Sequence, residues 1–400
     1  MNIEQYVKEG WKKTLRTATA EDVQRENTLI ALPKPFTIPC IDGFFQEMYY
    51  WDTYFTNCGL LVSGEFEIAR DNLENFAHLV NVYGFIPNGS RTWFLDRSQP
   101  PVFGLMIADY YKYTQDKEFL SWATNALEKE YLFWDTRRKA ENGLNCHSSD
   151  ATIETYGIGV QIYHERTGVL REDDVAYWGK NILAEAETGW DFNPRFSGKC
   201  HEYNPVDLNS LLYFNEKFLA FAQRELGTGD GLAWEELAQA RKQKMQAYML
   251  AEDGVYYDYS YVENKRSKIK SAASFFPYFV GLRQDDGGID ALLQALELPY
   301  GISATQETKE DYYQWGYKNG WPCMQFVVVE GLKNCTREED AKRIAKKYVD
   351  LVESVFEKKG KFFEKYNVLI GTEDAVSEYG TPEMLGWTAG VYLALKAFLA

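Results

Sequence analysis

The sequence lacks any run of about 20 consecutive apolar residues, the length that a helix needs to cross a bilayer. It has 400 residues, of which 45% are hydrophobic, enough for a large core. The first residues, 1–11, show no basic segment followed by an apolar stretch, so they do not resemble a signal peptide. We therefore expect no membrane partner and a cytoplasmic location.

Residues that bind transition metals are few, with six cysteines and four histidines in the chain. No CxxC motif occurs, and no cysteines and histidines have the spacing of zinc ligands. We expect no metal site and no cofactor. Because no export signal is present, we also expect the cysteines to be mostly buried, reduced thiols.

Basic residues are outnumbered, with 43 Lys and Arg against 59 Asp and Glu, giving a net charge of −16. This charge repels the phosphates of nucleic acids and the surface of anionic membranes, so it argues against both as partners. Solubility alone explains the excess of acid, and we attach no further function to it.

Linkers and alternating strand patterns are also scarce, whereas helical periodicity recurs along the chain. Apolar residues recur at spacings of three and four in the segments 68–82, 102–114, 117–134, 173–187, 206–225, 234–249, 321–333, 337–357 and 384–399. Residues 255–259 and 361–366 have the pattern of short hairpin strands. We expect one catalytic domain over residues 1–400, with residues 1–35 as an N-terminal helical extension packed on it.

So many helices in one domain fit either a superhelical solenoid or a closed double ring of helices. A solenoid predicts a constant repeat of roughly 34–45 residues, and the sequence shows no such self-similarity. The catalytic loops of a solenoid would also be hard to bring together at one site. The pattern by itself does not decide between the two folds.

Aromatic residues are abundant, with 24 Phe, 11 Trp and 28 Tyr making up 16% of the chain. Two aromatic segments, 49–55 and 84–101, also carry Asp, Asn, Arg and Gln, and the helical segment 68–82 separates them. Aromatic rings cover the apolar face of a pyranose, and planar amide, carboxylate and guanidinium groups pair with its hydroxyls. We interpret both segments as loops of a sugar-binding site.

Five motifs, in the same order and spread over residues 38–399, resemble those of the trehalase family, whose members hydrolyse α,α-trehalose to two glucose molecules. Examples are Arg-Ser-Gln-Pro-Pro, Gly-Trp-Asp-Phe and Glu-Lys-Tyr. The resemblance implies an all-α (α/α)6 toroid with short β-hairpins in the active-site loops, an inverting α-glycoside hydrolase, and no cofactor. The substrate-binding residues that it implies are Phe45, Trp51, Asp52, Asn88, Arg97, Gln99, Trp315, Trp321, Glu378 and Trp387. For the tryptophans the alternative is packing in the core, and for Arg97 a helix cap or a surface ion pair.

Asp191 is the candidate general acid. It follows the helical segment 175–187 and lies between Trp190 and Phe192, whose rings would desolvate the carboxyl and raise its pKa. The alternative is that Asp191 only braces the turn that Asn193 continues. The resemblance assigns the acid role to Asp191.

Glu364 is the candidate general base, because the neighbouring Lys365 favours an ionised carboxylate. The alternative is a surface ion pair with Lys361 or Lys365. The resemblance assigns to Glu364 the activation of water, although Glu378 competes for that role. Inversion predicts that the two carboxyl groups lie roughly 6.5–9.5 Å apart.

The sequence departs from the family pattern in three places. Phe44 stands where the family has Arg, and a Pro-Arg-Pro-Glu-Ser segment that contacts the substrate is missing, with only 164–166 or 171–173 to stand in for it. Gly316 replaces an Asp, and the lid over residues 371–379 lacks its polyglycine, which predicts a stiffer or more open entrance.

These departures leave alternatives open. A glucosylglycerate- or kojibiose-like α-glucoside is the alternative substrate, because thinned polar contacts change discrimination between sugars. A sugar-binding protein without activity would not need both Asp191 and Glu364. A sugar epimerase on the same fold works through paired histidines, and the four histidines here are scattered along the chain.

Overall fold

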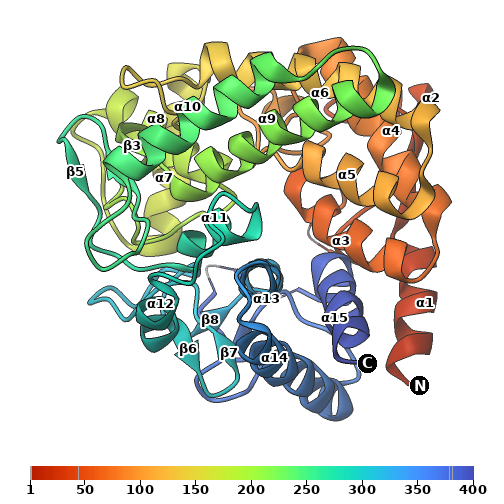
Figure 1. The fold of residues 1–400 in the computed structure, drawn as a ribbon. Coiled ribbons are helices and arrows are strands. Elements are labelled where there is room, and N and C mark those ends of the chain that lie inside the picture. Colours follow the sequence, from red (N-terminus) through yellow and green to blue (C-terminus); the bar gives the residue numbers. More distant parts are fainter. Residues whose placement is uncertain (1, 44, 378, 381) are drawn as a thin grey trace.

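The computed structural model describes residues 2–43, 45–377, 379–380 and 382–400. Its helices form a closed toroid of two layers, seen along its axis in Figure 1. Each helix of the inner layer packs on the next, and the last packs on the first. The inner helices are α3 (Tyr50–Val62), α5 (Phe103–Thr114), α9 (Val206–Leu226), α11 (Phe276–Phe279), α13 (Pro322–Asn334) and α15 (Gly386–Leu399). The predicted all-α (α/α)6 toroid is confirmed.

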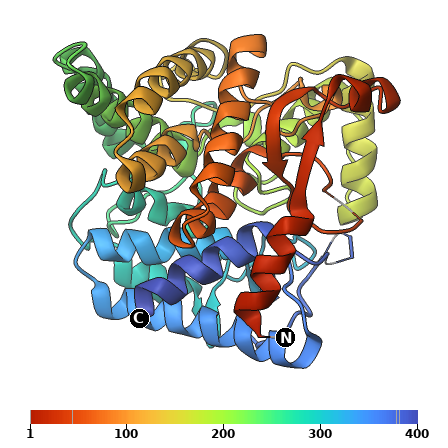
Figure 2. The same ribbon diagram turned by 90° about the vertical axis from the view of Figure 1, so that its right-hand side faces the viewer.

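The outer layer consists of helices that pack against the inner ring (Figure 1). They are α1 (Ile3–Thr14), α4 (Phe66–Tyr83), α6 (Lys117–Arg137), α10 (Leu232–Tyr248), α12 (Ile289–Leu296) and α14 (Glu338–Lys359). A further hairpin, α7 (Ile153–Thr167) with α8 (Val175–Glu187), precedes α9. Figure 2 shows α1 beside α15, with both termini at the same end of the molecule.

Strands in the described ranges are short and antiparallel. The strands are β1 (Leu15–Ala18) with β2 (Leu32–Thr37), β3 (Tyr203–Asn204) with β4 (Tyr259–Ser260) and β5 (Lys265–Arg266), β6 (Glu297–Leu298) with β7 (Gly301–Ile302), and β8 (Asn319–Gly320) with β9 (Tyr366–Asn367). The segment 1–35 contains α1, α2 (Ala20–Arg25), β1 and much of β2, so it is not purely helical.

The predicted helices agree with the structure to within a few residues, but the long helices α3 and α7 and the short helices α11 and α12 were missed. The interpretation of residues 49–55 as a loop is wrong, because α3 begins at Tyr50. Nearly all side chains of α3 are buried, so it has no polar face and therefore no amphipathic period. In α7, Gly157 and Gly159 lower the helix propensity.

The inner helices α3 and α15 approach each other closely through glycines. A Cβ atom on Gly59 would lie 2.4 Å from the Cα of Gly390, and one on Gly390 would lie 2.0 Å from the carbonyl oxygen of Phe55. This packing brings the first turns of both helices together, with the indoles of Trp51 and Trp387 6.0 Å apart.

All six cysteines are buried free thiols. Among the described residues, no helix combines the length and the apolar character that a membrane span requires.

We predict that Gly390→Ala lowers the free energy of unfolding by about 1–3 kcal/mol, because its methyl group forces two backbones apart. Gly157→Ala is the matched control, since its Cβ would meet only a side-chain atom of Val175 at 3.9 Å. This control should gain about 0.5–1 kcal/mol from the better helix former. Equal stability of both variants in urea unfolding would contradict close packing between α3 and α15.

Candidate active site

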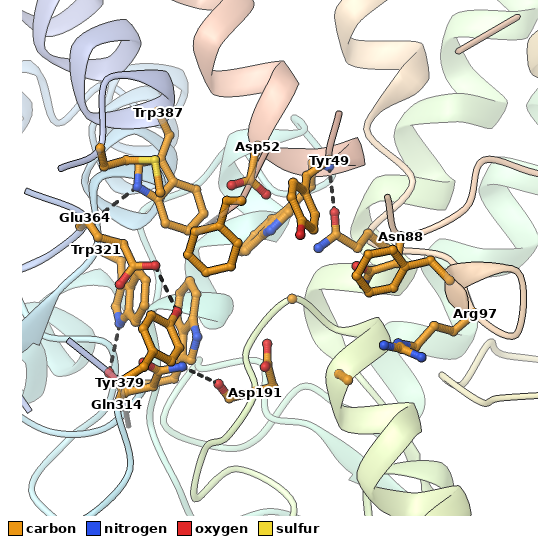
Figure 3. A pocket seen from close by; sticks show the side chains of 18 of the residues that line it. Tyr49, Asp52, Asn88, Arg97, Asp191, Gln314, Trp321, Glu364, Tyr379 and Trp387 are labelled. Carbon is orange, nitrogen blue, oxygen red and sulfur yellow. Dashed lines mark hydrogen bonds between the residues drawn. The ribbon is translucent and has the colours of Figure 1, made fainter. Parts of the chain in front are cut away.

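One pocket gathers the candidate residues at the end of the ring where the inner helices begin (Figure 3). Every predicted site residue that the structure describes lines this pocket: Phe45, Trp51, Asp52, Asn88, Arg97, Gln99, Asp191, Trp315, Trp321, Glu364 and Trp387. Phe44 and the predicted Glu378 lie outside the described residues.

Different elements bring these side chains together. Trp51 and Trp387 lie in the first turns of α3 and α15, and Trp321 immediately precedes α13. Asp191 follows α8, and Glu364 lies between α14 and β9.

Gly189 lets the Asp191 segment approach α3. Its φ is +73°, and a Cβ atom there would lie 2.6 Å from the Trp51 ring. Only glycine meets both requirements without strain.

Stacked indoles form the wall of the pocket. The rings of Trp315 and Trp321 are 3.7 Å apart and parallel to within 2°, and Trp190 stacks on the other face of Trp315 at 4.9 Å. The Arg195 guanidinium lies 4.6 Å from the Trp190 ring, and the Lys365 ammonium lies 4.7 Å from the Trp321 ring. We call this series of five side chains the indole column. Trp315 and Trp321 are thus core residues and pocket residues at once.

Arg195 closes the far end of the indole column with two buried ion pairs. Its guanidinium donates to both carboxylate oxygens of Asp207 at 2.8 Å and to those of Asp258 at 2.8 and 3.0 Å. The Asp258 carboxylate also accepts from the backbone N–H of Val206, the first residue of α9. These bonds fix Arg195, so its contact with the column is rigid.

Asp191 has the surroundings of a general acid. Burial raises the pKa of its carboxyl, against the opposing effect of Arg166, whose Nη1 lies 3.3 Å from Oδ2. The side chain keeps 34% exposure, through which it faces the pocket. Gln314 donates its Nε2 to the backbone oxygen of Asp191 at 2.7 Å (Figure 3).

The turn after Asp191 is braced by other groups. The Asn193 side chain donates to the Trp190 carbonyl, and its backbone N–H donates to Glu185, both at 2.7 Å. This turn therefore does not need the Asp191 side chain as a brace, which was the alternative role of that residue.

Glu364 is 2% exposed, so it is not part of a surface ion pair. Its Oε2 accepts from Lys365 Nζ at 2.5 Å, and its Oε1 accepts from the Tyr379 hydroxyl at 2.9 Å. Trp387 donates its indole N–H to the backbone carbonyl of Glu364 at 3.1 Å. Lys361 instead lies over the ring of Phe363, 5.3 Å from its centre. The Tyr379 and Trp387 bonds are drawn in Figure 3.

Asp52 is a third carboxyl in the pocket. Burial and, to a smaller extent, the nearby charges of Glu364 and Asp191 raise its pKa to about 8. At neutral pH this carboxyl is therefore mostly protonated and can donate a hydrogen bond as well as accept one.

Four polar residues of the pocket were not predicted as site residues from the sequence: Tyr49, Arg166, Gln314 and Tyr379. Tyr49, Gln314 and Tyr379 lie inside or beside the family motifs, so the sequence contained a signal for them. Arg166 and Arg171 lie in the two segments that could stand in for the missing family segment. Arg166 points into the pocket, whereas Arg171 lies over Trp178, 4.2 Å from the ring centre.

The carboxylate of Glu187, the last residue of α8, joins the loops around the pocket. It accepts from the backbone N–H of Ser98 at 2.9 Å and of Ser148 at 3.1 Å, and Arg138 Nε lies 2.9 Å away. His147 Nδ1 lies 3.1 Å from Oε1. Although burial opposes it, Arg138 and His147 lower the pKa of Glu187 to about 2. Glu187 thereby connects the segment containing Arg97 and Gln99 to the one containing Asp191.

Comparisons with known proteins agree on one family. The family model described as Trehalase matches residues 2–399. The chain is 32% identical to a periplasmic trehalase of Xanthomonas campestris pv. campestris, over 98% of this chain and 72% of the relative. It is also 32% identical to a periplasmic trehalase of Escherichia coli, over 95% and 71%.

Solved structures share the fold. The neutral trehalase of Saccharomyces cerevisiae superimposes with a TM-score of 0.81 at 26% identity, covering 96% of this chain and 80% of the other. A GH63 mannosylglycerate hydrolase of Thermus thermophilus matches with a TM-score of 0.63 at 18% identity, covering 90% and 96%. At that identity the second match supports the fold alone.

The prediction of a cytoplasmic location is wrong. The curated relatives from Xanthomonas, Escherichia and Pseudomonas are named periplasmic trehalases, which contradicts it. The prediction depended on the lack of a recognisable export signal, and such a lack does not define a compartment.

We predict that Glu187→Gln lowers the free energy of unfolding by about 3–5 kcal/mol at pH 7, because the buried Arg138 loses its buried counter-ion and keeps only Asp150, which is 44% exposed. The folded pKa of Glu187, about 2, lies below the ordinary value of 4.5, so its contribution is present above pH 4.5. The difference between variant and wild type should therefore shrink as the pH falls from 4.5 towards 2.

Glu353→Gln serves as the matched control in chemical unfolding. Glu353 pairs with Lys396, which is 53% exposed, and such a pair contributes about 0–1 kcal/mol. A Glu187 variant that is no less stable than this control would contradict the role of Glu187 in joining the loops.

Proposed function

Because this chain belongs to the trehalase family and is a glycoside hydrolase, we propose that it hydrolyses α,α-trehalose to two glucose molecules with inversion at the attacked anomeric carbon. The observation that carries the proposal is the pair Asp191 and Glu364 in one aromatic pocket, each with a partner suited to its role.

Asp191 acts as the general acid. Its raised pKa keeps the carboxyl protonated at a pH where an exposed aspartate is ionised. In the transition state it gives its proton to the glycosidic oxygen while the bond between that oxygen and the anomeric carbon breaks. The Arg166 guanidinium at 3.3 Å then stabilises the carboxylate that forms.

Glu364 acts as the general base on the other face of the sugar. It takes a proton from a water molecule whose oxygen forms the new bond to the anomeric carbon. One glucose therefore leaves as the β anomer. The Asp191 proton is on the other glucose, and the Glu364 proton returns to solvent.

The remaining pocket residues hold the two glucose rings. Trp51, Trp315, Trp321 and Trp387 offer apolar faces and edges, and Asn88, Arg97 and Gln99 offer planar polar groups. Asp52, mostly protonated, supplies a donor that a carboxylate could not.

A different α-glucoside, glucosylglycerate- or kojibiose-like, is the second candidate substrate. Gly316 in place of the family aspartate supports it, since one polar contact to the sugar is absent at that position. Arg166 supports trehalose, because it supplies to the pocket an arginine that the missing family segment would otherwise have contributed.

We predict that proton NMR of the protein with trehalose at first shows α- and β-glucose in equal amounts, because the attacked glucose is inverted to β and the leaving glucose keeps its α configuration. Asp191→Asn and Glu364→Gln should each lower kcat by about 100-fold or more, because each removes one proton transfer. The control is Asp290→Asn, whose carboxylate is 86% exposed on the outer helix α12 and should leave activity unchanged.

Other results would redirect the proposal. Initial release of α-glucose without β-glucose would contradict inversion. Inert trehalose beside a consumed α-glucoside would keep the two carboxyl roles and change the substrate. Tight binding of sugars without hydrolysis of any would contradict the catalytic roles.

A further inference from the structure

A buried lysine lies directly against the proposed base. Lys365 has no exposed surface, and its ammonium donates to Glu364 Oε2 at 2.5 Å. Completely buried lysines are rare because desolvation opposes their charge, so they occur where a partner requires them. Here the partner is the group that must receive a proton from water.

The ammonium is held from several sides. It lies 4.7 Å from the Trp321 ring and 5.1 Å from the Tyr379 ring, with the Ser377 hydroxyl at 3.4 Å. Cations over aromatic faces are attracted to the ring quadrupole, and this attraction is larger when water is excluded. Lys365 is therefore fixed in position.

The support continues away from the pocket. Trp321 stacks on Trp315, Trp315 stacks on Trp190, and Trp190 ends against Arg195. The backbone is also tied, because β8, which precedes Trp321, pairs with β9, which follows Lys365. The position of the ammonium is thus set by the indole column and by a strand pairing.

Lys365 is the cation that donates to the Glu364 carboxylate, and Arg97 and Arg166 also line the same pocket. Other titratable groups that face it include the carboxyls of Asp52 and Asp191, the Tyr379 hydroxyl, and the thiols of Cys40 and Cys323. Both carboxyls repel the Glu364 carboxylate whenever they are ionised themselves. Lys365 offsets this repulsion through its ion pair with Glu364 at 2.5 Å.

We infer that Lys365 is a positioning residue for hydrolysis, which keeps the Glu364 carboxylate ionised and in a fixed orientation for activating water. The inference depends on the proposed base role of Glu364. Lys365 occupies one oxygen and Tyr379 one acceptor position on the other, so the remaining acceptor position of Oε1 serves the water. Lys365 does not contact substrate in this arrangement, and it acts through Glu364.

The test compares Lys365→Met, Lys365→Arg and the control Lys361→Met, with trehalose as substrate over pH 4–9. We expect Lys365→Met to lower kcat by about 100-fold with less change in KM, because the base and not the sugar site is affected. Its acid limb of kcat/KM should move up by about one pH unit or more, since the base has lost its counter-ion.

Lys365→Arg retains the charge and should return the acid limb close to its wild-type pH, while kcat stays reduced because the planar guanidinium alters the orientation. Lys361→Met should match wild type in both respects. Thermal unfolding of each variant shows whether it is folded. If Lys365→Met does not fold, the Lys365→Arg profile and a Lys365→Gln variant decide the question.

The outcomes separate this inference from the proposed function. An active wild type with an inactive Glu364→Gln variant establishes the base. A folded Lys365→Met or Lys365→Gln variant with an unmoved acid limb and unchanged kcat would then overturn the role of Lys365 alone. An active Glu364→Gln variant would overturn the base assignment, and the inference with it.

Discussion

The parallel contact between the indoles of Trp315 and Trp321 is the constraint on which the site depends. At 3.7 Å separation these rings leave no room to slide without losing dispersion contacts on both sides. Trp315 stacks on Trp190, which directly precedes Asp191. Trp321 lies against the ammonium of Lys365, which binds Glu364. The relative placement of two groups that come from distant parts of the sequence is thus set by one stack.

The toroid and most of its helices could be predicted from the sequence, because amphipathic segments such as α4 and α14 keep a clear apolar period. Helix α3 could not, since it is buried on nearly all sides. Two short strands were predicted near β4 and β9, and the other described strands were missed. Their pairing could not be predicted either, because β8 and β9 join residues almost fifty positions apart. Local patterns carry no information on such contacts.

The pocket was easier to predict than its internal bonds. Motifs identified Asp191, Glu364 and the tryptophans, and all of them line the pocket. The partners that set their chemistry, Arg166 and Tyr379, come from segments where the sequence departs from the family pattern. The buried charges of Glu187 and Arg195 also could not be found, because a charged residue in a sequence is by default solvated. Only the fold shows which of the 59 acidic side chains are enclosed.

The inner helices have one more consequence for the chemistry. Because the pocket is at the end where they begin, the positive ends of their dipoles point towards it. The effect is strong only within the first turn, and Glu364 lies against the first turn of α15, where Trp387 and Thr388 donate to the backbone carbonyls of Glu364 and Phe363. In a protein with a net charge of −16, the ring of helices therefore provides a local field that favours an anion. In the proposed reaction, that field stabilises the hydroxide character that water acquires during attack, so the arrangement of the helices favours the same step as Glu364.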